Sequence, residues 1–294
     1  MNSKQSGLIF LKKPAGITSF QALHAIKQSL GHGKIGHTGT LDKFAEGLLI
    51  VLAGKNTRLV PYFEGLDKTY LADIRFGATT ETLDTESPEI EQTTVPSIAD
   101  IEAQLKFFQG EQEQIPPQYS AVHVDGKRAY QRTLQGEQVE IPARKINLYS
   151  IEALGWKEPV LSVRIHCSKG TYIRAFARDL GMACDSKAYL EGLQRTRIGP
   201  FDVSEAVEPA EFKPEQHLQS ATPALLQLPG ITDVLLEEHS IPKVLNGKPI
   251  QAEWLTIQQL SDGLYALVSS RGDLCALAEL SDNKWKYRYV AERN

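Results

Sequence analysis

Residues 36–47 read Gly-His-Thr-Gly-Thr-Leu-Asp-Lys-Phe-Ala-Glu-Gly, and they run directly into the apolar segment 48–52, Leu-Leu-Ile-Val-Leu. Glycines permit backbone angles that other residues avoid. Threonine and aspartate side chains hydrogen-bond the local backbone, which favours a loop over a helix. The apolar segment is typical of a buried strand. The stretch therefore predicts a loop that presents Asp42 beside a hydrophobic wall, where its carboxylate is either functional or a turn-former and helix cap.

The composition is that of an ordinary globular protein, with 41% hydrophobic and 23% charged residues among 294. This length suits one large domain and a small one. No run of about 18 apolar residues exists and the first residues lack an apolar targeting core, so we expect a cytoplasmic protein without a membrane segment. The three cysteines are widely spaced and form no Cys-x-x-Cys pair. This argues against a disulfide scaffold or a structural zinc and favours buried thiols.

The charge is distributed unevenly along the chain. Residues 1–60 carry eight Lys and Arg against two Asp and Glu, and residues 151–200 carry eight against five. Residues 61–100 carry two against nine, and residues 201–294 carry eight against fourteen. Phosphate binding needs a local basic patch rather than a basic protein. The net charge of −4 is therefore compatible with a nucleic-acid partner as well as with ordinary solvated surface charge.

Hydrophobic periodicity predicts a helix shortly before this loop. Phe20, Leu23, Ile26 and Leu30 recur at helical spacing, after a Thr-Ser cap and before Gly31. The same reasoning, applied along the chain, predicts strands over 8–11, 68–77 and 161–167 and helices over 54–65 and 96–109.

A second block of interest begins at the predicted strand 161–167. The turn Ser-Lys-Gly at 168–170 and the apolar positions after it indicate a strand–turn–helix unit. Arg174 and Arg178 are four residues apart and share one face of that helix. An arginine that faces a carboxylate forms a planar, charge-assisted pair. From the residues alone, Arg174 is therefore a candidate for a structural ion pair.

The chain changes character beyond about residue 225. Segments 245–250, 263–268 and 274–278 combine short apolar runs with turn residues, which predicts short strands. No internal repeat or low-complexity segment is present.

His-Thr-Gly-Thr-Leu-Asp at 37–42 resembles the signature loop of the TruB-type pseudouridine synthases. Lys43 departs from this pattern, because the family has a proline there, which would fix φ. Further resemblances to the family occur in order along the first 200 residues. They are Lys-Pro-x-Gly-x-Thr-Ser at 13–19, Lys-x-Tyr at 68–70, the segment 77–84 with Glu81 in place of Asp, Pro-Pro-x-Tyr-Ser-Ala at 116–121, Ser-Lys-Gly-Thr-Tyr-Ile-Arg at 168–174 and Leu-Gln-Arg-Thr-Arg at 193–197.

The resemblance implies an α+β fold. Residues 1–228 would form the pseudouridine synthase domain, a mixed and mostly antiparallel sheet flanked by helices, and residues 229–294 a small PUA-like β-barrel that binds RNA. A mobile RNA-binding segment near 116–146 would close over the RNA. Its basic residues are well placed to contact phosphates: Lys127, Arg128, Arg132, Arg144 and Lys145.

The resemblance also implies roles for site residues. Asp42 would be the catalytic nucleophile or electrostatic stabiliser, and Arg174 would orient it and keep its pKa low. Tyr70 would stack on the base and mediate proton transfer; from the residues alone it is a core aromatic. Substrate-binding positions would be His37, in the space vacated by a flipped base, and Tyr172 and Leu193, which would shape the uracil pocket. Their plainer interpretations are a loop hydrogen-bonder and ordinary core residues.

The implied activity is the isomerisation of a uridine in the T-arm loop of tRNA, position 55 in tRNA convention, to pseudouridine. The reaction needs no cofactor or metal, and we expect a monomer without an obligate protein partner. Three alternatives remain at this stage. They are a catalytically impaired RNA-binding or RNA-remodelling protein of the same fold, an acid/base hydrolase that uses His37 with Asp42, and a guide-dependent enzyme that modifies another RNA.

Overall fold

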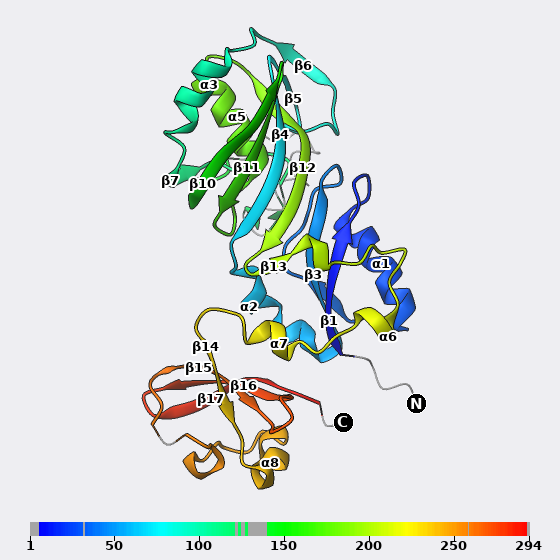
Figure 1. Ribbon diagram of the computed structural model, residues 1–294, viewed down its shortest axis with the longest axis vertical. Helices are drawn as coiled ribbons and strands as arrows, with labels where there is room; N and C mark the ends of the chain where they lie inside the picture. The colour runs from blue at the N-terminus through cyan, green and yellow to red at the C-terminus, as the bar shows by residue number, and fades with distance from the viewer. Residues whose placement is uncertain are drawn as a thin grey trace.

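The computed structural model describes residues 6–31, 33–120, 123–124, 127–128, 140–257 and 259–292. Two sheets dominate these residues, and they lie toward opposite ends of an elongated molecule (Figure 1). The larger sheet has nine strands. They are β1 (Gly7–Lys13), β2 (Ile35–His37), β3 (Glu46–Ala53), β4 (Lys68–Phe76), β7 (Gly110–Gln114), β10 (Arg144–Lys157), β11 (Val160–Cys167), β12 (Ala188–Ile198) and β13 (Phe201–Asp202).

Helices and short strands fill the connections. The helices in this part are α1 (Ser19–Leu30), α2 (Val60–Glu64), α3 (Ile98–Leu105), α5 (Ile173–Ala183), α6 (Pro214–His217) and α7 (Thr222–Leu225), with 3-10 turns η1 (Gly54–Leu59) and η2 (Val203–Glu205). Two separate hairpins are β5 (Ala78–Thr80) with β6 (Glu89–Gln92), and β8 (His123–Val124) with β9 (Lys127–Arg128).

The larger sheet is mixed and mostly antiparallel, as predicted. Its main order is β1-β3-β12-β4-β11-β10-β7, and only β3 and β12 pair in parallel. At that junction Gly47 lies opposite Arg195. A Cβ on Gly47 would lie 2.3 Å from the carbonyl oxygen of Arg195, and the φ of Gly47 is +114°. Only glycine therefore allows the parallel junction that joins the two halves of the sheet.

Strand alternation distributes the apolar residues over both faces of this sheet. Tyr70, Ala72, Ile74 and Phe76 of β4 point into one core, where they meet residues of α1, α3 and α5. This confirms the predicted face. On the other face of β1 and β3, alternate residues form a second core with α7 and with the C-terminal sheet. The site described below lies on the first face.

Helix α1 begins and ends as its sequence predicts. Thr18 is the N-cap of a capping box, and Gly31 adopts the left-handed conformation at the C-cap. Leu23, Ile26 and Leu30 are buried, but Phe20 is 68% exposed. Its assignment to the apolar stripe is therefore wrong. Ala22, which is fully buried, occupies the core-facing position of this first turn instead.

Residues from 231 onward form an open four-stranded sheet. Its order is β14 (Ile231–Leu235), β15 (Gly263–Val268), β16 (Leu274–Ser281) and β17 (Lys284–Val290), with α8 (Ile241–Leu245) and the turns η3 (Glu238–Ser240) and η4 (Ala252–Trp254). The described strands do not close into the expected β-barrel, because β14 and β17 each pair on one side only. The predicted strand over 245–250 is also wrong. Asn246 caps the end of α8 there instead of opening a hairpin.

Other expectations are corrected in detail. Helix α3 covers eight residues of the predicted 96–109, and strands β7, β10 and β12 were not predicted. Much of the expected mobile segment 116–146, including Arg132, lies outside the described residues, and so do the side chains of Lys127 and Arg128. No helix among the described residues is long and apolar enough to cross a membrane.

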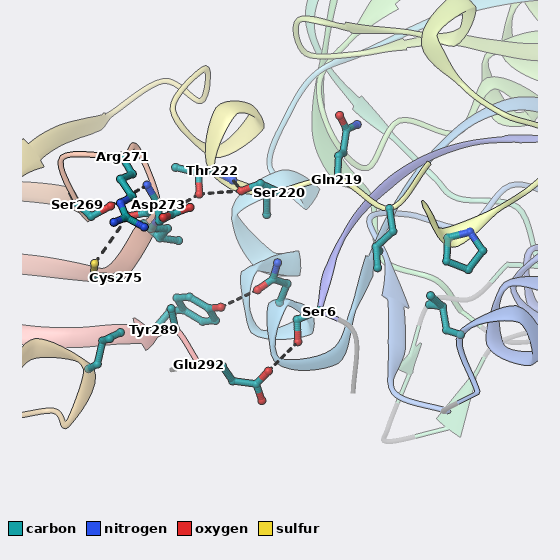
Figure 2. A pocket seen from close by; sticks show the side chains of 18 of the residues that line it. Ser6, Gln219, Ser220, Thr222, Ser269, Arg271, Asp273, Cys275, Tyr289 and Glu292 are labelled. Atoms are coloured by element: carbon teal, nitrogen blue, oxygen red, sulfur yellow. Dashed lines mark hydrogen bonds between the residues drawn. The ribbon is translucent and has the colours of Figure 1, made fainter. Parts of the chain in front are cut away.

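A polar cavity of about 1420 Å³ lies where the two sheets meet (Figure 2). Hydrogen bonds between the two parts cross it. Ser6 donates to Glu292 at 3.2 Å, and Tyr289 donates to Asn56 at 2.6 Å. None of the predicted site residues lines this cavity. It therefore belongs to the contact between the sheets and not to the predicted site.

Candidate active site

The loop of residues 36–47, here called the Asp42 loop, meets the first turn of α5 through an ion pair. Nε of Arg174 lies 2.9 Å from Oδ2 of Asp42, and Nη2 of Arg174 donates a hydrogen bond of 3.1 Å to Oδ1. The predicted pairing is therefore confirmed. The Asp42 side chain remains 36% exposed, whereas that of Arg174 is 6% exposed. The arrangement presents one carboxylate to solvent from a buried cationic support.

Arg174 also binds a second carboxylate, Asp84, which was not among the predicted site residues. Nη1 of Arg174 lies 3.2 Å from Oδ2 of Asp84, whose side chain is 3% exposed. The same guanidinium donates to the carbonyl oxygens of Thr82 at 2.8 Å and Tyr119 at 3.0 Å. Thr82 donates to the other oxygen of Asp84 at 2.5 Å. These three acceptors hold the guanidinium plane, and this plane sets the orientation of Asp42.

The electrostatics of Asp42 differ from the expectation. Burial raises the pKa of Asp42, and the charges of Asp84 and Glu86 raise it further, while Arg174 lowers it. The net direction is upward, so the expectation that Arg174 keeps this pKa low is wrong. One guanidinium shared with Asp84 does not outweigh desolvation and two neighbouring negative charges.

Tyr70 is the third residue of β4 and pairs with Arg195 of β12. Its side chain is part of the core and the residue is 8% exposed. Burial raises the pKa of the Tyr70 phenol, partly opposed by the guanidinium of Arg195, and the charge of Asp42 also acts on it. The phenol is therefore protonated at neutral pH and available as a hydrogen-bond donor near Asp42.

Arg195 is the second arginine that organises the site, and the predicted residues did not include it. It is 2% exposed. Nε donates to the carbonyl oxygen of Leu48 at 2.8 Å, and Nη2 donates to that of Gly39 at 3.0 Å. These bonds tie β12 to both ends of the Asp42 loop. Its sequence signal, Arg in Leu-Gln-Arg-Thr-Arg, does not reveal burial because its partners are backbone atoms about 150 residues away.

His37 lies at the end of β2 and is partly buried. Its Nδ1 accepts a hydrogen bond from the backbone N–H of Gly39 at 3.2 Å. Burial lowers the pKa of His37, and so does the charge of Arg195. The ring is therefore neutral at pH 7 and accepts a local hydrogen bond. These contacts agree with the plainer interpretation, and they also present the ring beside the start of the Asp42 loop.

Tyr172 and Leu193 each precede one of the two arginines by two residues. Tyr172 is the N-cap of α5, and its backbone exchanges two hydrogen bonds with the amide of Gln114. The guanidinium of Arg144 lies 5.2 Å from the centre of its ring. Leu193 lies opposite Ala72 and packs partly buried on the first core. Both lie on the elements that carry the site.

Three side chains support the backbone around Asp42. Nζ of Lys13 is fully buried and donates to the carbonyl oxygens of Ile17 at 2.7 Å and Lys43 at 3.4 Å. Glu86 accepts from the backbone N–H of Phe44 at 3.0 Å. Oγ of Ser19 accepts from the backbone N–H of Leu41 at 3.0 Å. The loop is thus fixed on both sides of Asp42 without the proline that the family has at position 43.

The comparisons with known proteins agree with this geometry. The family model for the TruB family pseudouridylate synthase, N-terminal domain, matches residues 27–173. A tRNA pseudouridine synthase B of Borrelia garinii subsp. bavariensis is 38% identical over 288 residues, which covers 96% of this chain and 98% of that one. One of Thermus thermophilus is 35% identical, with the same coverage.

The solved structures show the same fold at lower identity. A crystal structure of a Cbf5-Nop10-Gar1 complex contains a chain with a TM-score of 0.71 and 23% identity, covering 98% of this chain and 84% of that chain. The fold is that of a pseudouridine synthase. Within that class, this chain belongs to the TruB family.

Proposed function

We propose that this protein converts one uridine in the T-arm loop of tRNA, position 55 in tRNA convention, to pseudouridine. The observation that carries the proposal is the Asp42–Arg174 pair. In this pair a buried guanidinium holds a partly exposed carboxylate through an ion pair and a hydrogen bond. Relatives that are 35% and 38% identical over nearly their full length are named tRNA pseudouridine synthase B.

The chemistry assigns a role to each residue. Pseudouridine formation breaks the N1–C1′ bond of the uridine, turns the uracil and joins C5 to C1′. Asp42 acts as the carboxylate of this step, as nucleophile or as electrostatic stabiliser. Arg174 orients it. Tyr70, protonated at neutral pH because burial raises its pKa, contacts the base and relays a proton.

The target uridine must leave its stack to reach Asp42, so base flipping is part of the proposal. His37 then fills the vacated space, since a neutral ring costs less to desolvate than a charged one. Tyr172 and Leu193 shape the uracil pocket. Arg144 and Lys145 of β10 contact phosphates, which position the RNA without reading its sequence.

The domain organisation of the chain is also part of the proposal. Residues 1–228 form the catalytic domain, and residues 229–294 form a PUA-like RNA-binding domain. Support comes from the edge strand β17, where Lys284, Lys286 and Arg288 alternate along one exposed face. Contacts to phosphates weaken as the salt concentration rises. The double substitution Lys284→Gln/Lys286→Gln should therefore lower the salt slope, which is the slope of log Kd for tRNA against the logarithm of the salt concentration, by about 1 to 2. An unchanged slope would remove this face from the RNA interface.

The protein is proposed to act as a cytoplasmic monomer on free tRNA. The test of the whole proposal is chemical mapping of pseudouridine in an unmodified tRNA transcript after incubation with the pure protein, without added cofactor. One new pseudouridine at position 55 is expected, and none in a transcript with cytidine at that position. Binding of tRNA without any pseudouridine would instead favour an RNA-remodelling protein of the same fold.

A further inference from the structure

The solvent-facing side of α1 carries an unusual group of side chains. Phe20, His24 and Lys27 are four and three residues apart, so they form one stripe of the helix. Phe20 is 68% exposed and packs into neither core. Nζ of Lys27 lies 5.0 Å from the centre of its ring, a cation–π arrangement. The stripe therefore offers solvent an aromatic ring with a cation beside it.

This stripe adjoins the Asp42 loop. Oγ of Ser19 accepts from the backbone N–H of Leu41 and donates to its carbonyl oxygen, both at 3.0 Å. The backbone N–H of Gly16 donates to the carbonyl oxygen of Lys43 at 2.8 Å. Phe20 follows Ser19 directly, and Asp42 follows Leu41 directly. These hydrogen bonds therefore fix the start of α1, which carries Phe20, next to the Asp42 loop.

The charge around the stripe favours an anionic partner. Asp42 is the first acidic residue of the chain, so α1 and the segment before it contain none. Lys43, next to Asp42, is exposed. Its side chain forms no ion pair or hydrogen bond with any residue that the structure describes. A cation fixed at the mouth of the site without a protein partner is suited to a phosphate.

We propose that Phe20, Lys27 and Lys43 form a binding edge for the unpaired RNA strand next to the flipped uridine. Phe20 stacks on one base, and the two lysines contact phosphates. Stacking on an aromatic ring tolerates any base, and single-stranded RNA combines it with backbone cations. The inference rests on the proposed function, since it names how the same site holds its RNA.

The position of this edge gives it a distinct task. In the sheet order, α1 lies beside β1 and β3, whereas Arg144 and Lys145 lie on β10, at the other side of the sheet (Figure 1). The two groups therefore lie toward opposite edges of the sheet. An RNA loop that contacts both is held across the site, which reduces its freedom once the uridine has flipped.

The test compares tRNA binding by single variants with a matched pair just after the end of α3. Phe107 is 82% exposed and follows the exposed Lys106, so Phe107→Ala and Lys106→Gln are the controls. Phe20→Ala should raise the Kd of an unmodified tRNA transcript about tenfold, the size expected for one lost base stack, and Phe20→Tyr should restore it. Lys27→Gln and Lys43→Gln should each lower the salt slope of log Kd by about 0.7 to 0.9. The controls should change neither quantity.

Failure of this inference is separable from failure of the proposed function. Pseudouridine formation by the wild-type protein tests the function, whereas Kd and its salt slope test the edge. Equal Kd values for Phe20→Ala and Phe107→Ala would overturn the stacking. Unchanged salt slopes in both lysine variants would overturn the phosphate contacts. Four of the five substituted residues are exposed and Lys27 is partly exposed. Circular dichroism verifies that each variant is folded.

Discussion

Arg174 connects Asp42 to Asp84, so that the exposed carboxylate of the site and a buried one share a single guanidinium. The shared contact has two consequences. It fixes the plane in which Asp42 lies, and it places a second negative charge near Asp42 that raises its pKa. Orientation and protonation of Asp42 therefore depend on the same three side chains.

Asp42→Asn should abolish turnover while tRNA binding is retained, because the amide keeps the shape of the carboxylate but neither attacks C1′ nor stabilises positive charge. We expect a fall in the single-turnover rate of about 10³-fold or more. Pseudouridine mapping at saturating protein measures the rate, and filter binding measures Kd. Asp73→Asn on the outer face of β4 is the matched control, and it should leave both quantities unchanged. Equal rates in Asp42→Asn and wild type would contradict the assignment.

Arg174→Lys should slow catalysis about 100-fold, since an ammonium cannot contact both oxygens of Asp42 together with Asp84 and two carbonyls. Stability should also fall, because Asp84 is 2% exposed and would lose part of its compensation. Urea unfolding and the single-turnover rate separate the two effects. Arg178→Lys, one helical turn further along α5, provides the comparison. A rate loss equal in both variants would show that Arg174 has no special role.

Asp84→Asn should shift the acidic limb of the pH profile. The active form of Asp42 is the carboxylate, so a raised pKa means that activity is lost at a higher pH as the solution is acidified. The charge of Asp84 contributes to that rise, and its removal should move the limb of kcat/KM to lower pH. The profile between pH 4 and 8 measures the shift. Movement of the limb in the opposite direction would mean that Asp84 acts on Asp42 only by positioning Arg174.

Sequence patterns correctly predicted the secondary structure that depends on residues close together in the chain. The alternation of β4 and the helical spacing of α1 and α5 were confirmed because a strand or a helix is a local repeat. The ion pair of Asp42 and Arg174 came from the family resemblance, since residues 132 positions apart share no local signal. Arg195 was missed for the same reason, because its partners are the carbonyls of Leu48 and Gly39.

The wrong predictions also have physical causes. Phe20 fits the helical spacing but faces solvent. Periodicity gives the direction of a side chain around the helix axis, but it does not show whether another element packs against it there. The predicted strand at 245–250 relied on a short apolar run with turn residues, but these turn residues end helix α8. Closure of the C-terminal strands into a barrel depends on pairing between distant edges, which no local pattern specifies.

Lys13 should make the stability of the protein depend on alkaline pH. Burial lowers its pKa from 10.5 to about 8, so between these values the unfolded chain binds more protons than the folded one, and stability rises with pH. The free energy of unfolding of wild type minus that of Lys13→Met should increase from pH 8 to 10.5 by at most about 3 kcal/mol. Urea unfolding at four pH values measures it. A difference that falls over this range would show that the ammonium is favoured by its carbonyl partners.

Gly47→Ala should disrupt the junction on which the site is built. A Cβ at this position would lie 2.3 Å from the carbonyl oxygen of Arg195, and the φ of +114° is unfavourable for alanine. We expect a loss of about 3 kcal/mol or more in the free energy of unfolding, since backbone atoms on both sides must move. Gly65→Ala is the matched control, because a Cβ there meets nothing within 4 Å. It should change the free energy by less than about 0.5 kcal/mol. Equal free energies of unfolding of the two variants would show that β3 and β12 can separate without loss of stability. The hydrogen bonds from Arg195 could then not hold the Asp42 loop in place.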